Sequence, residues 1–158
     1  MTHDAFSSVG SANPAKEAIH PAVAGTEELA VFLNELLEAE RAGARVTLES
    51  ARTAPTAELA MLLHDIQRDE ARWCAMLLRQ LQALGKPASR QIGDFHARAM
   101  AMEDFGLRLV FLNRGQGWVV RKLREMIPRV ADGALRVDLC HMLSSHVANI
   151  TLVNSAPL

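Results

Sequence analysis

Three ionisable residues lie where the helical repeat of this sequence calls for an apolar side chain. Glu40 and Glu70 each interrupt a series of leucine and isoleucine residues spaced three and four apart, and His146 does the same near the C-terminus. A carboxylate without a partner in an apolar interior is costly, so a buried Glu needs a cation, a hydrogen-bond donor or a metal. Carboxylate oxygens and an imidazole nitrogen at one depth of a helical bundle are typical ligands of iron or manganese.

Each of these residues also has a purely structural alternative. Glu40 and Glu70 could form buried ion pairs with an arginine such as Arg41, Arg45 or Arg72, which would satisfy both charges without any chemistry. His146 could be a core histidine that is hydrogen-bonded to a carboxylate. Residue type and spacing leave both alternatives open.

Glu103 is the candidate for a fourth metal ligand. The small residues Ala99 and Gly106 share its helical face and leave room beside it. At about 100° per residue, however, Glu103 lies roughly 120° from the apolar stripe that contains Phe105 and Leu109. We therefore expect Glu103 at the margin of the core or outside it.

The hydrophobic pattern indicates four main helices and no strand. Proline or glycine separates them at Pro55, at Gly85 and at Pro128. Two glycines within the segment 113–118 predict a kink or a short break in the third helix. The predicted helices span about 26–52, 55–84, 94–128 and 134–153. The sequence therefore predicts an all-α four-helix bundle, in which the connection 85–93 is either a simple turn or a crossover.

Two regions differ in composition. Residues 1–25 are rich in Ser, Ala, Gly and Pro without periodicity, so we expect a disordered N-terminal tail. Thr26, followed by two glutamates, is the predicted N-cap of the first helix. Residues 26–158 then form one bundle domain, for which a chain of 158 residues is long enough.

The overall composition excludes several classes of protein. The apolar runs are too short to span a bilayer, and the first 25 residues lack the basic and apolar regions of a signal peptide, so we expect a cytoplasmic protein without a membrane partner. A net charge of −1 without segregated sign gives no reason to expect nucleic acid. Cys74 and Cys140 have no second cysteine nearby and are interpreted as reduced apolar residues.

Four helices with an acidic residue on each of the first three and a histidine on the last resemble the ferritin-like superfamily, in the rubrerythrin-like style of dimetal-carboxylate bundles. The phrases LLEAERAG at 36–43, DEARW at 69–73 and NRGQGW at 113–118 resemble an uncharacterised group of bacterial ferritin-like proteins. The resemblance covers residues 26 to about 153. It implies a four-helix bundle with a non-haem iron or manganese site.

The sequence also departs from the superfamily pattern, in which the second and fourth helices each carry Glu-x-x-His. Trp73 stands three residues after Glu70, where the histidine belongs. Asp138 and His141 have the right spacing on the last helix, but His141 faces away from His146. A complete diiron site is therefore not expected. Trp73, Asp138 and His141 remain candidates for residues around the site or in a pocket.

Two functional hypotheses follow. In the first, Glu40, Glu70, Glu103 and His146 bind iron or manganese for redox chemistry with oxygen or peroxide. In the second, the bundle holds no metal, because Trp73 fills the volume of a lost ligand. It then acts as a binding or scaffold module, and the face 115–124 is the candidate surface for pairing with a second copy. The sequence shows no catalytic nucleophile paired with a general base, and it has no phosphate-binding loop. Both observations argue against other enzyme classes.

Overall fold

The computed structural model describes residues 21–157, which form helices and no strand. The predicted all-α class is therefore confirmed for the described part of the chain. Residues 1–20 of the predicted tail lie outside the described residues. The elements are α1 (Thr26–Arg52), α2 (Ala57–Ala83), α3 (Phe95–Met100), α4 (Phe105–Met126), the short 3-10 turn η1 (Ile127–Arg129) and α5 (Ala134–Asn154).

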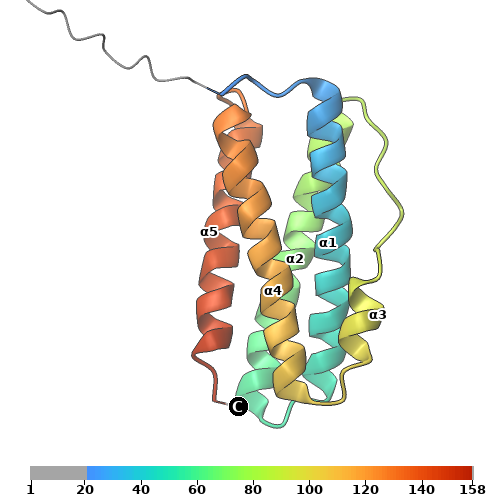
Figure 1. The fold of residues 1–158 in the computed structure, drawn as a ribbon, viewed down its shortest axis with the longest axis vertical. Coiled ribbons are helices and arrows are strands. Elements are labelled where there is room, and N and C mark those ends of the chain that lie inside the picture. The colour runs from blue at the N-terminus through green and yellow to red at the C-terminus, as the bar shows by residue number, and fades with distance from the viewer. Residues whose placement is uncertain (1–20, 158) are drawn as a thin grey trace, which may run out of the picture.

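The four long helices form a bundle in which α1 packs against α2 and α4, and α5 packs against the same two helices (Figure 1). A short turn joins α1 to α2, so these two helices are antiparallel, as are α4 and α5. The connection after α2 runs back along the outside of α1 to the short helix α3 at the other end of the bundle. The chain therefore uses a crossover rather than a simple turn, and α2 and α4 run in the same direction.

The predicted third helix is divided, but at another place than the sequence suggested. The break lies at residues 101–104, and Asp104 caps α4 by accepting a hydrogen bond from the Leu107 N–H (2.7 Å). The helix α4 is continuous through Gly115 and Gly117, so the predicted short break in this segment is wrong. A Cβ atom on Gly115 would lie 2.7 Å from Cζ of Phe95, so this glycine serves the close approach of α3 instead. The same contact covers part of the face 115–124.

The helix ends carry local capping residues. Thr56 caps α2 by accepting from the Leu59 N–H (3.2 Å), and Gly85 follows α2 with a φ of +66°, a conformation that glycine adopts without strain. Thr26 is not the N-cap of α1, because Gly25 occupies that position. Ordered structure begins before this helix, since the buried Ala24 donates its N–H to the Arg129 carbonyl (2.8 Å).

The bundle interior contains two apolar clusters, one toward each end. The first includes Leu33 and Leu37 of α1 with Leu77, Leu123 and Met142. The second cluster lies toward the other end and is built from residues such as Val46, Leu63, Ile66, Leu109 and Leu112. On each long helix, a buried polar side chain lies between the residues of the two clusters. No helix within residues 21–157 is long and apolar enough to cross a bilayer.

Candidate functional site

One buried polar residue from each long helix lies between the two apolar clusters. We call these four residues the polar layer: Glu40 of α1, Glu70 of α2, Gln116 of α4 and His146 of α5. Each of the four is at most 4% exposed. The fold brings three of the four sequence-predicted candidates, Glu40, Glu70 and His146, into the lining of one cavity, without placing them to hold a metal ion together.

Glu40 and His146 are direct partners. Nε2 of His146 lies 2.8 Å from Oε1 of Glu40, and both side chains are almost completely buried. A carboxylate oxygen can only accept, so Nε2 donates the hydrogen bond. This is the arrangement of a core histidine bonded to a carboxylate. The second carboxylate oxygen of Glu40, Oε2, and the other ring nitrogen, Nδ1 of His146, have no hydrogen-bond partner.

Glu70 lies against α1 and has different surroundings. Its Oε2 accepts a hydrogen bond from Oγ1 of Thr47 (3.1 Å), and a Cβ atom on Gly43 would lie only 2.5 Å from its Oε1. Glycine at position 43 therefore makes room for the carboxyl group. Burial raises the pKa of Glu70 well above its ordinary value, and the negative charge of Glu40 raises it further, while the Thr47 bond opposes both. Glu70 thus keeps its proton at a pH where an exposed glutamate has lost it.

Arginine does not neutralise the two buried acids. Within residues 21–157 the only ion-pair partner of Glu40 is His146, and Glu70 has none. Arg41 donates to the Ser89 carbonyl and Arg72 to Asp69, so both point away from the polar layer. The sequence-based alternative of Arg–Glu pairs is therefore wrong for these residues.

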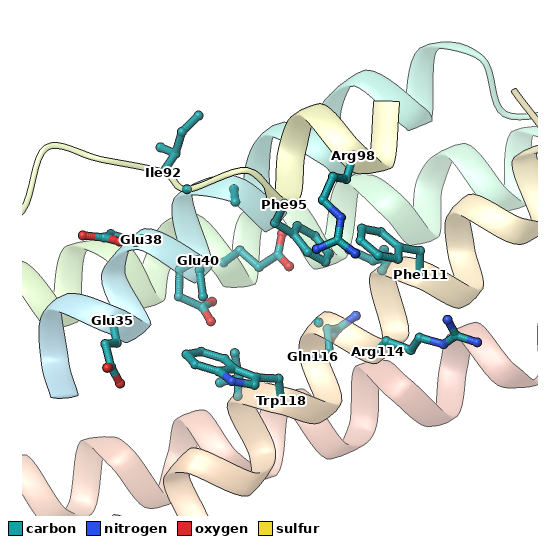
Figure 2. A pocket seen from close by; sticks show the side chains of 18 of the residues that line it. Glu35, Glu38, Glu40, Ile92, Phe95, Arg98, Phe111, Arg114, Gln116 and Trp118 are labelled. Atoms are coloured by element: carbon teal, nitrogen blue, oxygen red, sulfur yellow. The ribbon is translucent and has the colours of Figure 1, made fainter. Parts of the chain in front are cut away.

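A cavity of about 500 Å³ opens beside the polar layer between α1, α3 and α4. Glu40 and Gln116 reach into it from opposite helices, and the stacked rings of Phe95 and Phe111 form a wall beside them (Figure 2). The two ring centroids are 4.7 Å apart. The inner end is thus polar and buried, while the wall is aromatic. Charged residues surround the mouth: Glu35, Glu38, Asp94, Arg98, Arg114 and Arg121.

The comparisons with known proteins give one match. Residues 27–155 match a family described as "Domain of unknown function (DUF6306)". The chain belongs to this family. The match includes every helix of the bundle and all four residues of the polar layer. No curated protein and no solved structure matches the chain.

Gln116 is the member of the DUF6306 site that sequence reasoning missed. Its Oε1 is buried without a partner, and its Nε2 reaches Oδ1 of Asn113 only at 3.5 Å. The signal was present, because Leu109, Leu112, Gln116, Val119 and Leu123 follow the same spacing of three and four that identified Glu40. The two glycines beside Gln116 drew attention to a kink instead.

Four sequence-predicted candidates lie elsewhere. Glu103 is exposed in the connection before α4, so its assignment as a fourth ligand is wrong. Asp138 accepts from Nε2 of Gln80 (2.9 Å), and His141 is exposed on the outer side of α5. Trp73 packs in the first apolar cluster and does not line the cavity. The guanidinium of Arg72 lies over the Trp73 ring, with its Cζ 4.4 Å from the ring centroid.

Cys74 lies near the polar layer but does not add chemistry to it. Burial raises the pKa of the Cys74 thiol to about 12, with a further contribution from the charge of Glu40, while Arg41 lowers it. The thiolate is the form that binds metals and attacks electrophiles. Cys74 therefore remains a neutral thiol at physiological pH, as the sequence predicted for a small apolar residue.

The DUF6306 site contains residue types that bind metals, but too few of them are placed together to hold one. Within the described residues, no three His, Cys, Asp or Glu side chains are placed to hold a metal ion together. Glu40 and His146 supply a carboxylate and an imidazole, but burial raises the pKa of Glu70 and so disfavours its carboxylate form, and Gln116 offers only an amide oxygen. A site with three anionic or imidazole ligands does not fit this arrangement.

Proposed function

We propose that this DUF6306 protein is a helical bundle that binds a small molecule in the cavity beside the polar layer, without a resident metal. One observation carries the proposal. Three buried polar atoms without a partner, Oε2 of Glu40, Oε1 of Gln116 and Nδ1 of His146, belong to residues that line the same cavity. A cavity of about 500 Å³ is also within the usual size range of small-molecule sites.

The energetic cost of these atoms supports a binding role. A buried polar group without a partner costs about 1–3 kcal/mol, and most native proteins contain few of them. A fold with three such atoms in residues that line one cavity is less stable at that place. This loss is expected where a ligand completes the hydrogen bonds. The two apolar clusters on either side are closely packed and supply the compensating stability.

We also propose that the fold is ferritin-like. Ferritin-like bundles consist of two helical hairpins joined by one long crossover connection. The pairs α1/α2 and α4/α5 and the connection 84–94 between them have this order (Figure 1). The position of the polar layer, with one residue from each long helix, is the second point of agreement.

A fragment screen tests the binding role. We expect several small aromatic fragments to raise the melting temperature of the wild-type protein, because a ligand that binds only the folded state stabilises it. Replacing Ala39, which lines the cavity, by phenylalanine (Ala39→Phe) should remove most of these shifts. Ala60→Phe is the matched control, since Ala60 is similarly half-buried on α2 but does not line the cavity. Absence of any fragment whose effect Ala39→Phe removes would disprove the proposed role.

Iron or manganese is the second candidate occupant. Its ligands would be Glu40 and His146, with Glu70 as a third only after a shift from its position in this structure. It is favoured because the atoms without partners are lone-pair oxygens and a nitrogen of the types that these metals bind. When bound, the metal would supply redox chemistry with oxygen or peroxide. Glu70 would first have to release its proton, so metal uptake would be linked to proton release.

Metal analysis of protein purified without chelator or added metal separates the two candidates. We expect less than about a tenth of an equivalent per chain of iron, manganese or zinc, and no change in melting temperature on adding metal. About one equivalent of iron or manganese that is lost in Glu70→Ala would instead establish the metal site and replace the first proposal.

A further inference from the structure

Two of the unpartnered atoms of the site are acceptors by their chemistry, Oε2 of Glu40 and Oε1 of Gln116. The residues to which they belong line the same cavity. A ligand that satisfies both oxygens must therefore bring hydrogen-bond donors.

The charge of the inner end points the same way. Two buried acids, Glu40 and Glu70, line this end of the cavity, and Oε2 of Glu40 has no hydrogen-bond partner. No arginine or lysine lies within ion-pair distance of either acid in residues 21–157. Buried acids without an arginine or lysine partner favour a ligand that brings a positive charge.

The wall of the cavity defines the rest of the ligand. Phe95, Phe111 and Trp118 line the space together with Leu112 and Val119 (Figure 2). Aromatic faces attract an organic cation and pack against an apolar body. A space of about 500 Å³ is far larger than a single ion needs and accommodates a small organic molecule.

We propose that the ligand is a primary ammonium compound with a small apolar or aromatic body. Its ammonium group would donate to Glu40 Oε2 and Gln116 Oε1, with the body against Phe95 and Phe111. This inference rests on the proposed binding function and assigns the chemical class of the ligand to that same cavity.

Calorimetric titration with three probes that share a phenylethyl body tests the inference: 2-phenylethylamine, 2-phenylethanol and 3-phenylpropionate. In metal-free buffer at neutral pH, we expect the amine to bind at least about tenfold more tightly than the alcohol, and the carboxylate not to bind. Glu40→Gln should weaken amine binding by about tenfold and leave the alcohol within about twofold. Glu49→Gln is the matched control, because Glu49 is a carboxylate of α1 that also bonds a histidine, His96, but does not line the cavity. It should change neither affinity by more than about twofold.

The outcomes separate this inference from the function on which it rests. Equal binding of amine and alcohol, or an amine preference that persists in Glu40→Gln, overturns the ammonium assignment and leaves the cavity as a binding site. Failure of all three probes, with fragments still bound in a manner sensitive to Ala39→Phe, also overturns the assignment alone. Should Glu40→Gln unfold, Gln116→Leu provides the same comparison, because it removes one acceptor without removing the charge.

Discussion

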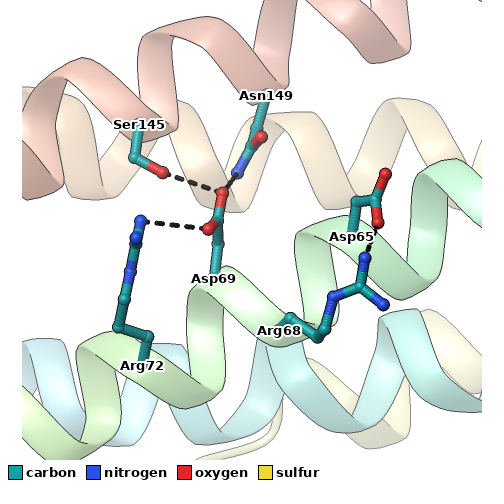
Figure 3. A network of polar contacts seen from close by, with 6 residues as sticks. All are labelled: Asp65, Arg68, Asp69, Arg72, Ser145 and Asn149. Carbon is teal, nitrogen blue, oxygen red and sulfur yellow. Dashed lines mark hydrogen bonds and ion pairs between the residues drawn. The ribbon is translucent and has the colours of Figure 1, made fainter.

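Two adjacent acids on α2 have opposite surroundings. Asp69 is partly exposed and accepts from Oγ of Ser145 (2.9 Å), Nδ2 of Asn149 (3.3 Å) and Nη2 of Arg72 (3.0 Å) (Figure 3). Glu70 is buried and accepts from Thr47 alone. The same contrast recurs on α5, where Ser145 serves the Asp69 network and His146 belongs to the polar layer.

The difference shows how a structural polar contact is distinguished from a candidate site in this fold. The Asp69 network joins α2 to α5 at the surface, and its carboxylate has a donor at each oxygen. The polar layer is buried, yet three of its polar atoms have no partner. A fully satisfied network stabilises a fold, whereas a partly satisfied one in the interior is a liability unless something binds there.

The largest expected effect comes from His146→Ala, which leaves the buried Glu40 carboxylate without a donor. Breaking a buried pair from one side costs about 3–5 kcal/mol of unfolding free energy. Ser145→Ala, one residue earlier, removes only one of three bonds to a partly exposed acid and should cost about 1 kcal/mol or less. Urea denaturation of both variants measures the two costs.

The double variant Glu40→Leu with His146→Leu is the control for this prediction. Replacing both members of a buried pair by apolar residues is often nearly neutral, so the double variant should recover most of the lost stability. Equal costs for His146→Ala and Ser145→Ala would remove the contrast between the two regions.

A smaller effect is expected at the cavity wall. Gly115→Ala places a methyl group 2.7 Å from the Phe95 ring, and such overpacking costs about 1–3 kcal/mol. Gly117→Ala on the same helix would meet only Nη1 of Arg121 at 3.8 Å, so it should gain up to about 1 kcal/mol from its better helix propensity. Thermal unfolding measures both changes. Similar stabilisation in both variants would show that α3 does not pack closely on α4.

The smallest expected effect, counted per pH unit, is the pH dependence that Glu70 contributes to the free energy of unfolding. Its pKa is raised in the folded protein, so its contribution favours folding below the ordinary glutamate value and is lost as the pH rises toward the folded pKa. Glu70→Gln removes this contribution. Relative to wild type, the variant should therefore gain stability above about pH 4.5, by at most about 1.4 kcal/mol per pH unit.

Thr47→Val sharpens the pH measurement. The Thr47 hydroxyl lowers the pKa of Glu70, so its removal should extend the pH-dependent loss of stability to higher pH. Denaturation curves from pH 4 to pH 8 test both variants. A stability difference between wild type and Glu70→Gln that does not change with pH would show that Glu70 is not held protonated.

Local sequence patterns determined the helices and most of the polar layer. The predicted spans 26–52 and 134–153 agree with α1 and α5 to within one residue, because the helical repeat and the breakers act over a few residues. The same repeat identified Glu40, Glu70 and His146 as inward-facing. It would also have identified Gln116, had the glycines on either side not been interpreted as a kink.

Only the tertiary structure decided what these inward residues meet. The bond between Glu40 and His146 joins positions 106 residues apart, and the Thr47 contact that opposes the protonation of Glu70 spans 23 residues. The crossover after α2, the fit of Phe95 against Gly115 and the resulting cavity likewise depend on packing between distant segments. The direction of a side chain follows from the local helix geometry, but its partners, its protonation and the space beside it depend on the other helices.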